Sequence, residues 1–177
     1  INFNSNSILS VTSKNVDQST KSIVSSNNLP QEINQLIIDL QASDDGDLAT
    51  AYREAQKNGL SVENLTSDNR MKRFKTAFSN IFENMEYLGI ENIQNRKAIL
   101  FKKFNINVPI EMLSSGEKQI VYRGAFLLKD CNSLQGAFVF IDEPEISLHP
   151  EWQKKIMNYY CDIFRNSEGT QTSQIFA

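Results

Sequence analysis

The sequence has few of the residues that build metal centres and disulfide frameworks. It contains two cysteines and one histidine in 177 residues. Cys131 and Cys161 lie too far apart for the close spacing of zinc ligands, so we expect both to be reduced, buried thiols. No apolar run is long enough to span a bilayer, and no signal-peptide pattern opens the chain. These absences exclude disulfide scaffolds and zinc ribbons, and we expect a cytoplasmic protein without membrane contact.

An excess of positive charge is also absent. The 18 Lys and Arg residues stand against 21 Asp and Glu, a formal net charge of −3. Binding to nucleic acid would therefore need a local patch or a partner. One basic cluster stands out: Arg70, Lys72, Arg73 and Lys75. It could touch nucleic acid, but we interpret it as a solvated helix face, which is the commoner case.

The most informative stretch is an apolar run that ends in two acids. Phe138 to Ile141 is unbroken, which predicts a strand buried on both faces of an α/β sheet. Asp142 and Glu143 follow at its C-terminal end, where open α/β sheets bind ligands. An aspartate there can position Mg²⁺, which prefers oxygen ligands. A glutamate beside it can take a proton from the water that attacks a γ-phosphate, so the pair predicts phosphate chemistry.

A second motif lies upstream of that strand. Ser114 and Glu117 have the spacing of a capping box, so a helix should begin at Ser114 or Ser115. The first turn of such a helix offers free N–H groups and a positive dipole end to a phosphate, and Gly116 lets a ligand approach the backbone. The stripe expected to be buried on this helix consists of Ile120, Val121, Gly124, Leu127 and Leu128.

Together the two motifs resemble a known family. The stretch 113–119, Leu-Ser-Ser-Gly-Glu-Lys-Gln, resembles the signature motif of ABC-class ATPases, and 138–144, ending Asp-Glu-Pro, resembles their Walker B strand. The continuation Glu-Ile-Ser-Leu-His-Pro at 145–150 looks like the soluble SMC-, RecF- and overcoming-lysogenisation-like branch. Its style is nearest to the PtuA-like ATPase subunit of Septu and retron anti-phage systems. The resemblance covers the last third of the chain.

This resemblance implies an α/β fold, the C-terminal half of an ABC-type P-loop NTPase core beside a helical lobe. We expect a connecting segment over 1–29, a mostly helical lobe over 30–110, and the core with signature, Walker B strand and D-loop over 111–177. Residues 5–13 could form a strand, but no period is sustained there. The elements expected along the chain are helices from Pro30 to the acidic turn 43–47, from Asp47 to Asn58-Gly59, from Asn69 to Met85 and from Pro150 to Phe164, and strands at 98–103 and 173–177.

The resemblance also implies roles for particular residues, with ATP and Mg²⁺ as cofactors. Glu143 would be the catalytic base and Asp142 the metal residue. In a head-to-tail dimer or higher oligomer, the signature of one copy would bind the nucleotide held by the other. The residues expected to do so are Ser114, Ser115, Gly116, Glu117 and Lys118, and the D-loop residues are Ser147, Leu148 and His149.

Three functions fit these motifs. The first is an ATP-hydrolysing switch subunit that controls a nucleic-acid-directed effector in anti-phage defence, with a separate HNH-type nuclease subunit as partner. The second is the nucleotide-binding subunit of a membrane transporter, which Glu145 and the Leu-His-Pro sequence at 148–150 disfavour. The third is a non-enzymatic scaffold that uses the ABC fold to dimerise.

A glycine followed by lysine occurs nowhere in the sequence, so the chain has no G-K-[ST] phosphate loop. Either the chain is a piece of an intact ATPase or it is a domain that has lost nucleotide binding. The start at Ile1, the stop at Ala177 inside an expected strand and the intact Asp142-Glu143 pair favour the piece. We therefore expect the phosphate loop and the switch histidine of the family to lie outside this stretch.

Overall fold

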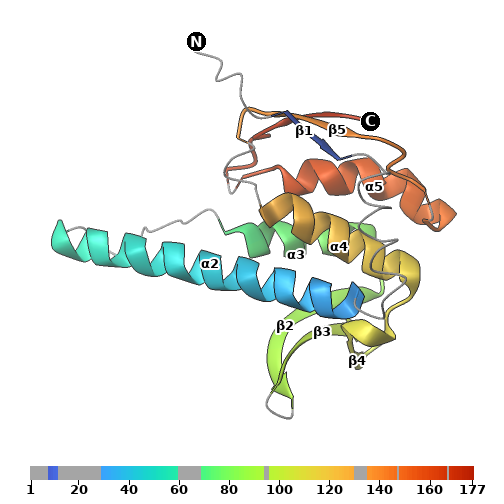
Figure 1. The fold of residues 1–177 in the computed structure, drawn as a ribbon, viewed down its shortest axis with the longest axis horizontal. Helices are drawn as coiled ribbons and strands as arrows, with labels where there is room; N and C mark the ends of the chain where they lie inside the picture. Colours follow the sequence, from blue (N-terminus) through green and yellow to red (C-terminus); the bar gives the residue numbers. More distant parts are fainter. Residues whose placement is uncertain are drawn as a thin grey trace.

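The computed structural model describes residues 8–11, 29–59, 69–93, 96–129, 135–146, 148–166 and 168–177 (Figure 1). Its elements in chain order are β1 (Ile8–Val11), α2 (Leu29–Lys57), α3 (Arg70–Ile81), β2 (Met85–Ile93), β3 (Arg96–Lys103), β4 (Ile106–Pro109), the short 3-10 helix η2 (Ile110–Met112), α4 (Ser115–Lys129), β5 (Phe138–Ile141), α5 (Pro150–Ile163) and β6 (Gln174–Phe176).

A parallel sheet in the order β1-β5-β6 forms one side of the molecule. Ile8 pairs with Phe138 and Phe138 pairs with Gln174, so the last strand runs parallel to the strand that carries the two acids, as predicted. In Figure 1 this sheet lies at the top, with α5 and α4 directly below it. The first strand, β1, falls inside the stretch 1–29, which was expected to be a connecting segment. It lies within residues 5–13, the part that could form a strand. The rest of that stretch lies outside the described residues.

The prediction that β5 is buried on both faces is wrong. Val139 and Ile141 are buried against the helices, whereas Phe138 and Phe140 are 40% and 45% exposed. These two rings contact the ring of Phe176 on β6, with centroids 5.9 and 5.1 Å apart. The strand alternates because the helices among the described residues cover only one face of the sheet. Sequence could not reveal this, because both faces carry apolar side chains.

A second, antiparallel sheet in the order β2-β3-β4 lies at the opposite side of the molecule (Figure 1). Only β3 was predicted. The first strand hides its alternation because a register shift occurs between Tyr87 and Gly89, and Gly89 adopts a φ of +132°. The third strand is short and ends in Pro109, which cannot donate to a ladder. The region 30–110 is therefore less helical than expected.

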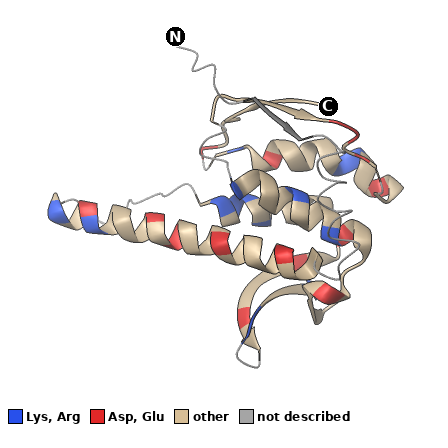
Figure 2. Ribbon diagram, in the orientation of Figure 1, with Lys and Arg blue, Asp and Glu red and all other residues tan. Residues whose placement is uncertain are grey.

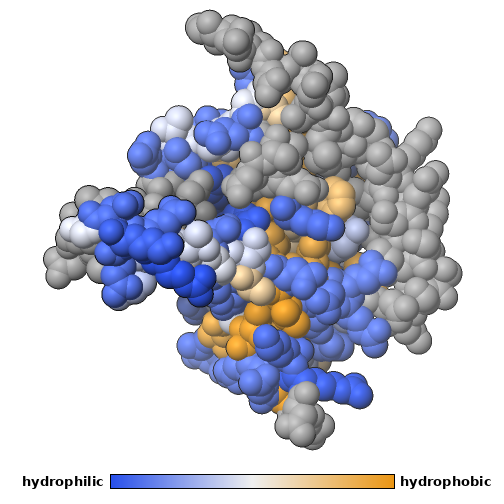
Figure 3. All heavy atoms as spheres, turned by 60° about the vertical axis from the view of Figure 1, so that its left-hand side comes forward, coloured by the Kyte–Doolittle hydropathy of each residue, from blue (hydrophilic) through white to orange (hydrophobic). Residues whose placement is uncertain are grey.

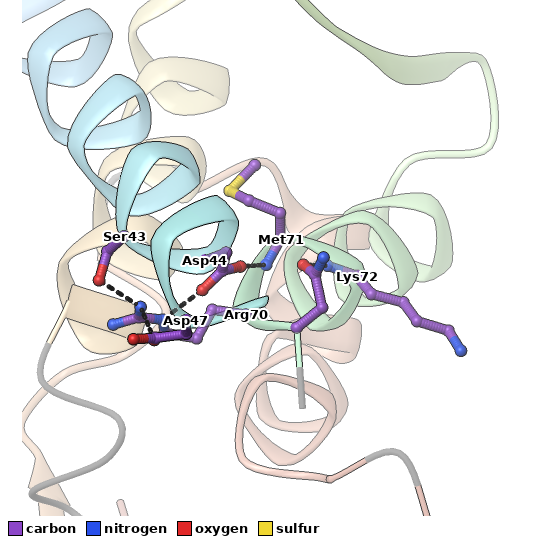
Figure 4. Close-up of polar contacts among 7 residues, drawn as sticks. Ser43, Asp44, Asp47, Arg70, Met71 and Lys72 are labelled. Atoms are coloured by element: carbon purple, nitrogen blue, oxygen red, sulfur yellow. Dashed lines mark hydrogen bonds and ion pairs between the residues drawn. The ribbon is translucent and has the colours of Figure 1, made fainter. Parts of the chain in front are cut away.

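The expected break at the acidic turn 43–47 does not occur, because α2 runs unbroken through it. Asp44 points into the protein instead of ending the helix. Its carboxylate accepts from Arg70 Nε at 2.6 Å and from the Met71 amide at 2.9 Å (Figure 4). Arg70 also donates to Ser43 Oγ and to Asp47. This tertiary contact with α3 outweighs the turn preference of the local sequence.

The interpretation of the basic cluster as a solvated face is half wrong. Arg70 and Arg73 are buried at 7% exposure each, and only Lys72 and Lys75 reach solvent. The helix α3 begins after Asn69, whose side chain accepts from the Lys72 amide. Figure 2 shows Lys and Arg gathered at the start of α3 and acids spread along α2. Arg70, the first residue of the cluster, therefore joins these two helices.

Aromatic side chains of α3 and of Phe82, just after it, connect the antiparallel sheet to α5. Phe74 and Phe78 are fully buried. Phe78 contacts Phe101 of β3 at 5.3 Å, and Phe82, just after the helix, meets Trp152 of α5 at 5.0 Å. The helix is shorter than predicted, since the chain turns into β2 at Met85. The predicted stripe of α4 is buried throughout, and α5 begins at Pro150 as expected.

The coloured part of the face drawn in Figure 3 is mostly hydrophilic, with apolar atoms gathered in its lower part and near the middle of the view. Among the described residues, no helix has the length and apolar character needed to cross a membrane. Cys161 is a free, half-buried thiol on α5, while Cys131 lies outside the described residues.

Candidate functional site

The first turn of α4 is closed by the capping box that the sequence predicts. The Glu117 carboxylate accepts from the Ser114 amide at 2.8 Å, and the Glu117 amide donates to Ser114 Oγ at 3.4 Å. Ser114 and Ser115 are exposed and Gly116 is half-buried. The first amides of a helix have no partner within it, so this turn presents donors and a positive dipole end to solvent. We call residues 113–118 the signature turn.

Glu117 is not available to a ligand, because its carboxylate is 7% exposed and both its oxygens have partners. One oxygen accepts from Ser114, and the other accepts from the Lys103 ammonium of β3 at 2.8 Å. Burial alone would raise the pKa of Glu117, but the bonds from Lys103 and Ser114 outweigh it and hold the pKa below its ordinary value. Glu117 therefore remains a carboxylate that ties the signature turn to the antiparallel sheet.

Lys118, the last residue expected to bind nucleotide, donates from its ammonium to the Glu111 carbonyl at 2.8 Å. Glu111 belongs to η2, directly before the signature turn. This contact steers the Lys118 side chain back along the chain. The exposed groups in the turn are then the two serines and the backbone at Gly116.

The second part of the site is the turn that follows β5, residues 142–148, here called the acid turn. Asp142 and Glu143 are both exposed at the C-terminal end of the strand. The Ile146 amide donates to the Glu143 carbonyl at 3.1 Å, which closes a β-turn with Pro144 at the position that favours proline. The two carboxylates therefore stand at the ligand-binding edge of the parallel sheet.

Glu143 is held in an unusual backbone conformation. Its φ is +50°, in the left-handed region. This region costs an L-residue roughly 1–2 kcal/mol, and a residue before proline also favours extended backbone instead. Such conformations persist where the surrounding structure over-determines them, and they cluster at functional sites. No sequence signal predicted this feature.

One helix links the two turns. Arg123, on α4, donates from Nη1 to the Pro144 carbonyl at 2.6 Å. In Figure 1 the first turn of α4, the end of β5 and the start of α5 lie toward the same, right-hand side. Both turns thus lie toward the same side in this view, and Arg123 bonds the acid turn to the helix that begins at the signature turn. Each is anchored by a residue that the sequence analysis did not single out, Lys103 for the first and Arg123 for the second.

Both missed residues have a weak local signal. Arg123 interrupts the buried stripe of α4 with a charge, and it is only 5% exposed. A positively charged residue beside a buried apolar stripe indicates a specific hydrogen-bond acceptor, because a buried charge needs a partner. Lys103 ends a strand and looks like an ordinary solvated lysine. Its acceptor lies on another element, so the contact is visible only in the fold.

The D-loop residues have structural contacts. His149 caps α5: its Nδ1 accepts from the Glu151 amide at 3.4 Å, and its ring lies 5.7 Å from that of Trp152. Leu148 is buried, and its carbonyl accepts from Gln153 at 3.1 Å. Ser147 lies outside the described residues. The structure therefore assigns a helix-capping function to the one histidine.

Mg²⁺ and a nucleotide can be compared with the groups present. Among the described residues no group of three or more His, Cys, Asp or Glu side chains could hold a metal ion. Mg²⁺ is usually bound by one or two carboxylates and takes its other ligands from water and phosphate oxygens. The exposed carboxylate pair is sufficient for a cation of this kind. Asp142 is the residue that would face such a cation. The signature turn, with amides and serines, suits phosphate oxygens.

Comparison with known proteins identifies the family of the chain. No curated protein matches the chain. A family model matches residues 1–177, and its description is "AAA domain, putative AbiEii toxin, Type IV TA system". The match covers the whole sequence, including both turns. The chain therefore belongs to this family of P-loop ATPases of the ABC/AAA type.

Proposed function

We propose that this chain is part of an ATP-hydrolysing switch subunit that dimerises head to tail around Mg-ATP. One observation carries the proposal: a self-capped helix start and a carboxylate pair at the end of a parallel strand are joined through one helix, α4. The helix start can bind phosphate oxygens, and the carboxylate pair can bind a metal ion and accept a proton from water. In this arrangement the phosphate loop would come from sequence outside this chain.

The roles follow from the contacts of each residue. Ser114, Ser115 and the amide of Gly116 bind the γ-phosphate held by the partner copy, because they are the accessible donors of the signature turn. Glu117 and Lys118 hold this turn in shape through their own bonds, so neither contacts the nucleotide directly. This changes the two roles expected from the resemblance.

Asp142 would hold the magnesium ion, and Glu143 would accept the proton of the attacking water. Bound Mg²⁺ would neutralise charge on the phosphate oxygens. Both carboxylates are exposed, so both are accessible to a ligand. A buried pair would need internal partners instead.

The output of the switch is an effector that acts on nucleic acid. The described residues carry no metal cluster that could cut a phosphodiester by itself, so we propose a separately encoded nuclease, of HNH type, as partner. The family description names a toxin of a type IV TA system, which fits a two-component arrangement. A cytoplasmic location and the PtuA-like assignment belong to the same proposal.

The test uses the full-length protein with its phosphate loop. Ser114→Arg places a large cation over the partner's γ-phosphate, so ATP should still bind while ATP-dependent dimerisation and turnover are lost. Gln56→Arg, on an exposed position of α2, is the matched control and should behave as wild type. Light scattering with and without ATP gives the dimer fraction. A Ser114→Arg protein that dimerises and hydrolyses normally would refute the arrangement in trans.

A further inference from the structure

We propose that Arg123 is a positioning residue for Glu143: from the signature helix it holds the Pro144 carbonyl and thereby fixes the conformation of the acid turn. The inference rests on the proposed role of Glu143 in ATP hydrolysis. Among the described residues Arg123 has no hydrogen bond to the signature turn, so its effect on the site is placed in the acid turn.

The first step is the environment of the guanidinium. Arg123 is 5% exposed, and its polar contacts within the described residues are neutral oxygens. Its Nη1 donates to the Pro144 carbonyl at 2.6 Å and reaches the Tyr160 hydroxyl at 3.4 Å, while Nε has no partner there. A buried cation held only by neutral oxygens among the described residues is costly, and a hydrophobic residue of similar size would pack as well. Packing alone therefore does not account for an arginine here.

The second step is the acceptor. The peptide that joins Glu143 to Pro144 has no amide hydrogen, and its carbonyl, that of Glu143, already accepts from the Ile146 amide within the turn. The Pro144 carbonyl is the next acceptor along the chain. A bond from a charged donor is shorter and stronger than one between neutral groups. Arg123 therefore holds the turn directly after the catalytic glutamate.

The third step is the strain at Glu143. A φ of +50° before a proline is unfavourable and needs support from outside the turn. The Ile146–Glu143 hydrogen bond closes the turn. Gln153 of α5 donates to the carbonyls of Glu145 at 3.5 Å and Leu148 at 3.1 Å, which holds the later part of the turn. The first part, directly after Glu143, is held by the Arg123 bond. Without it, Glu143 can return to a negative φ, which points its carboxylate in another direction.

The experiment compares Arg123→Met with wild type in the full-length protein. We expect turnover at saturating ATP to fall about 10- to 100-fold, with KM for ATP changed less than about threefold, since nucleotide-binding groups are untouched. On a Glu143→Gln background the same change should reduce the residual turnover no further. Arg123→Lys, which keeps one charged donor, should recover most of the loss.

Two controls separate positioning from general stability. Arg70→Met removes an arginine that is about as buried as Arg123 but forms its ion pair with Asp44 on α2. It should leave kcat nearly unchanged in protein that is still folded. Tyr160→Phe removes only the second acceptor of Arg123 and should leave turnover unchanged. Equal losses from Arg123→Met and either control would overturn the proposal, and so would a full additional loss on the Glu143→Gln background.

A readout without turnover keeps the two proposals distinguishable. Hydrogen exchange of the Ile146 and Leu148 amides, both bonded within the acid turn, should quicken in Arg123→Met and in Arg123→Lys to a smaller extent. This holds whether or not the protein hydrolyses ATP. Inactive wild-type protein would refute the proposed function, whereas unchanged exchange at these amides would refute the role of Arg123. If Arg123→Met does not fold, exchange in Arg123→Lys decides the matter.

Discussion

The signature turn and the acid turn are linked through α4 but are stabilised in different ways. Within the signature turn the main contacts join residues three positions apart, Ser114 and Glu117. The acid turn depends on Arg123, 21 positions away from the carbonyl it holds. The signature turn is stabilised mainly by contacts within itself. The conformation of the acid turn depends on contacts with other elements.

This difference shows in the backbone as well. The signature turn uses ordinary helical geometry after an extended residue, and none of its residues has a positive φ. The acid turn holds Glu143 in the left-handed region. A binding surface can thus be built from local, unstrained structure, while the residue proposed to perform chemistry is the strained one. Mutations in the two turns should therefore differ in kind.

The sharpest test of the comparison is Glu143→Gln. The amide cannot accept the proton of the attacking water, so turnover should fall by about 10²- to 10⁴-fold while ATP binding persists. Phosphate release and nucleotide titration on the full-length protein measure the two quantities. Glu151→Gln, an exposed acid at the start of α5, serves as the control. If the two variants hydrolyse ATP equally well, Glu143 is not the base.

Gly124→Ala should disturb the helix that links the two turns. A Cβ at this position would clash with the hydroxyl of Tyr159, which donates to the Ile120 carbonyl at 2.9 Å, and would lie 3.3 Å from the Phe74 ring. We expect a loss of about 1–3 kcal/mol in the free energy of unfolding. Denaturant unfolding measures it.

Gly46→Ala is the opposite case and the control for Gly124. Nothing lies within 4 Å of a Cβ there, and the residue is inside α2. The substitution should stabilise the protein by roughly 0.5–1 kcal/mol, since alanine loses less conformational entropy in a helix. Equal effects at the two glycines would show that contact with α5 does not constrain α4.

Lys103→Met tests whether the signature turn needs support from outside itself. Glu117 would keep its bond from the Ser114 amide and lose only the ion pair, so we expect a rise of about three- to tenfold in the ATP concentration needed for dimerisation. Lys102→Met, an exposed neighbour on the same strand, is the control. A dimerisation midpoint that moves as far in the control as in Lys103→Met would argue against a specific role for the ion pair.

The smallest expected effect is a pH dependence at Glu117. Its pKa lies below the ordinary value of 4.5, so its carboxylate stabilises the folded state at any pH above that value. The contribution is lost as the pH falls through the lowered pKa. The difference in unfolding free energy between wild type and Glu117→Gln should therefore be constant from about pH 7 to about pH 5 and shrink below about 4.5. A difference that grows on acidification would contradict the assignment.

The sequence by itself determined the elements that depend on neighbours along the chain. The S-x-x-E spacing places the start of α4, Pro150 places the start of α5, and the apolar run before Asp142 places β5. Each signal works because the interacting groups lie within one turn or on one strand. The position of the two acids at a strand end follows from the same local pattern.

The tertiary structure decided the features that depend on distant groups. Asp44 stays inside a continuous helix because Arg70 neutralises it from α3. Phe138 and Phe140 are exposed because the helices among the described residues cover the other face of their strand. Glu143 adopts its left-handed backbone in a turn that Arg123 holds from α4. In each case the deciding partner comes from another element, and a local pattern contains no information about which element that will be.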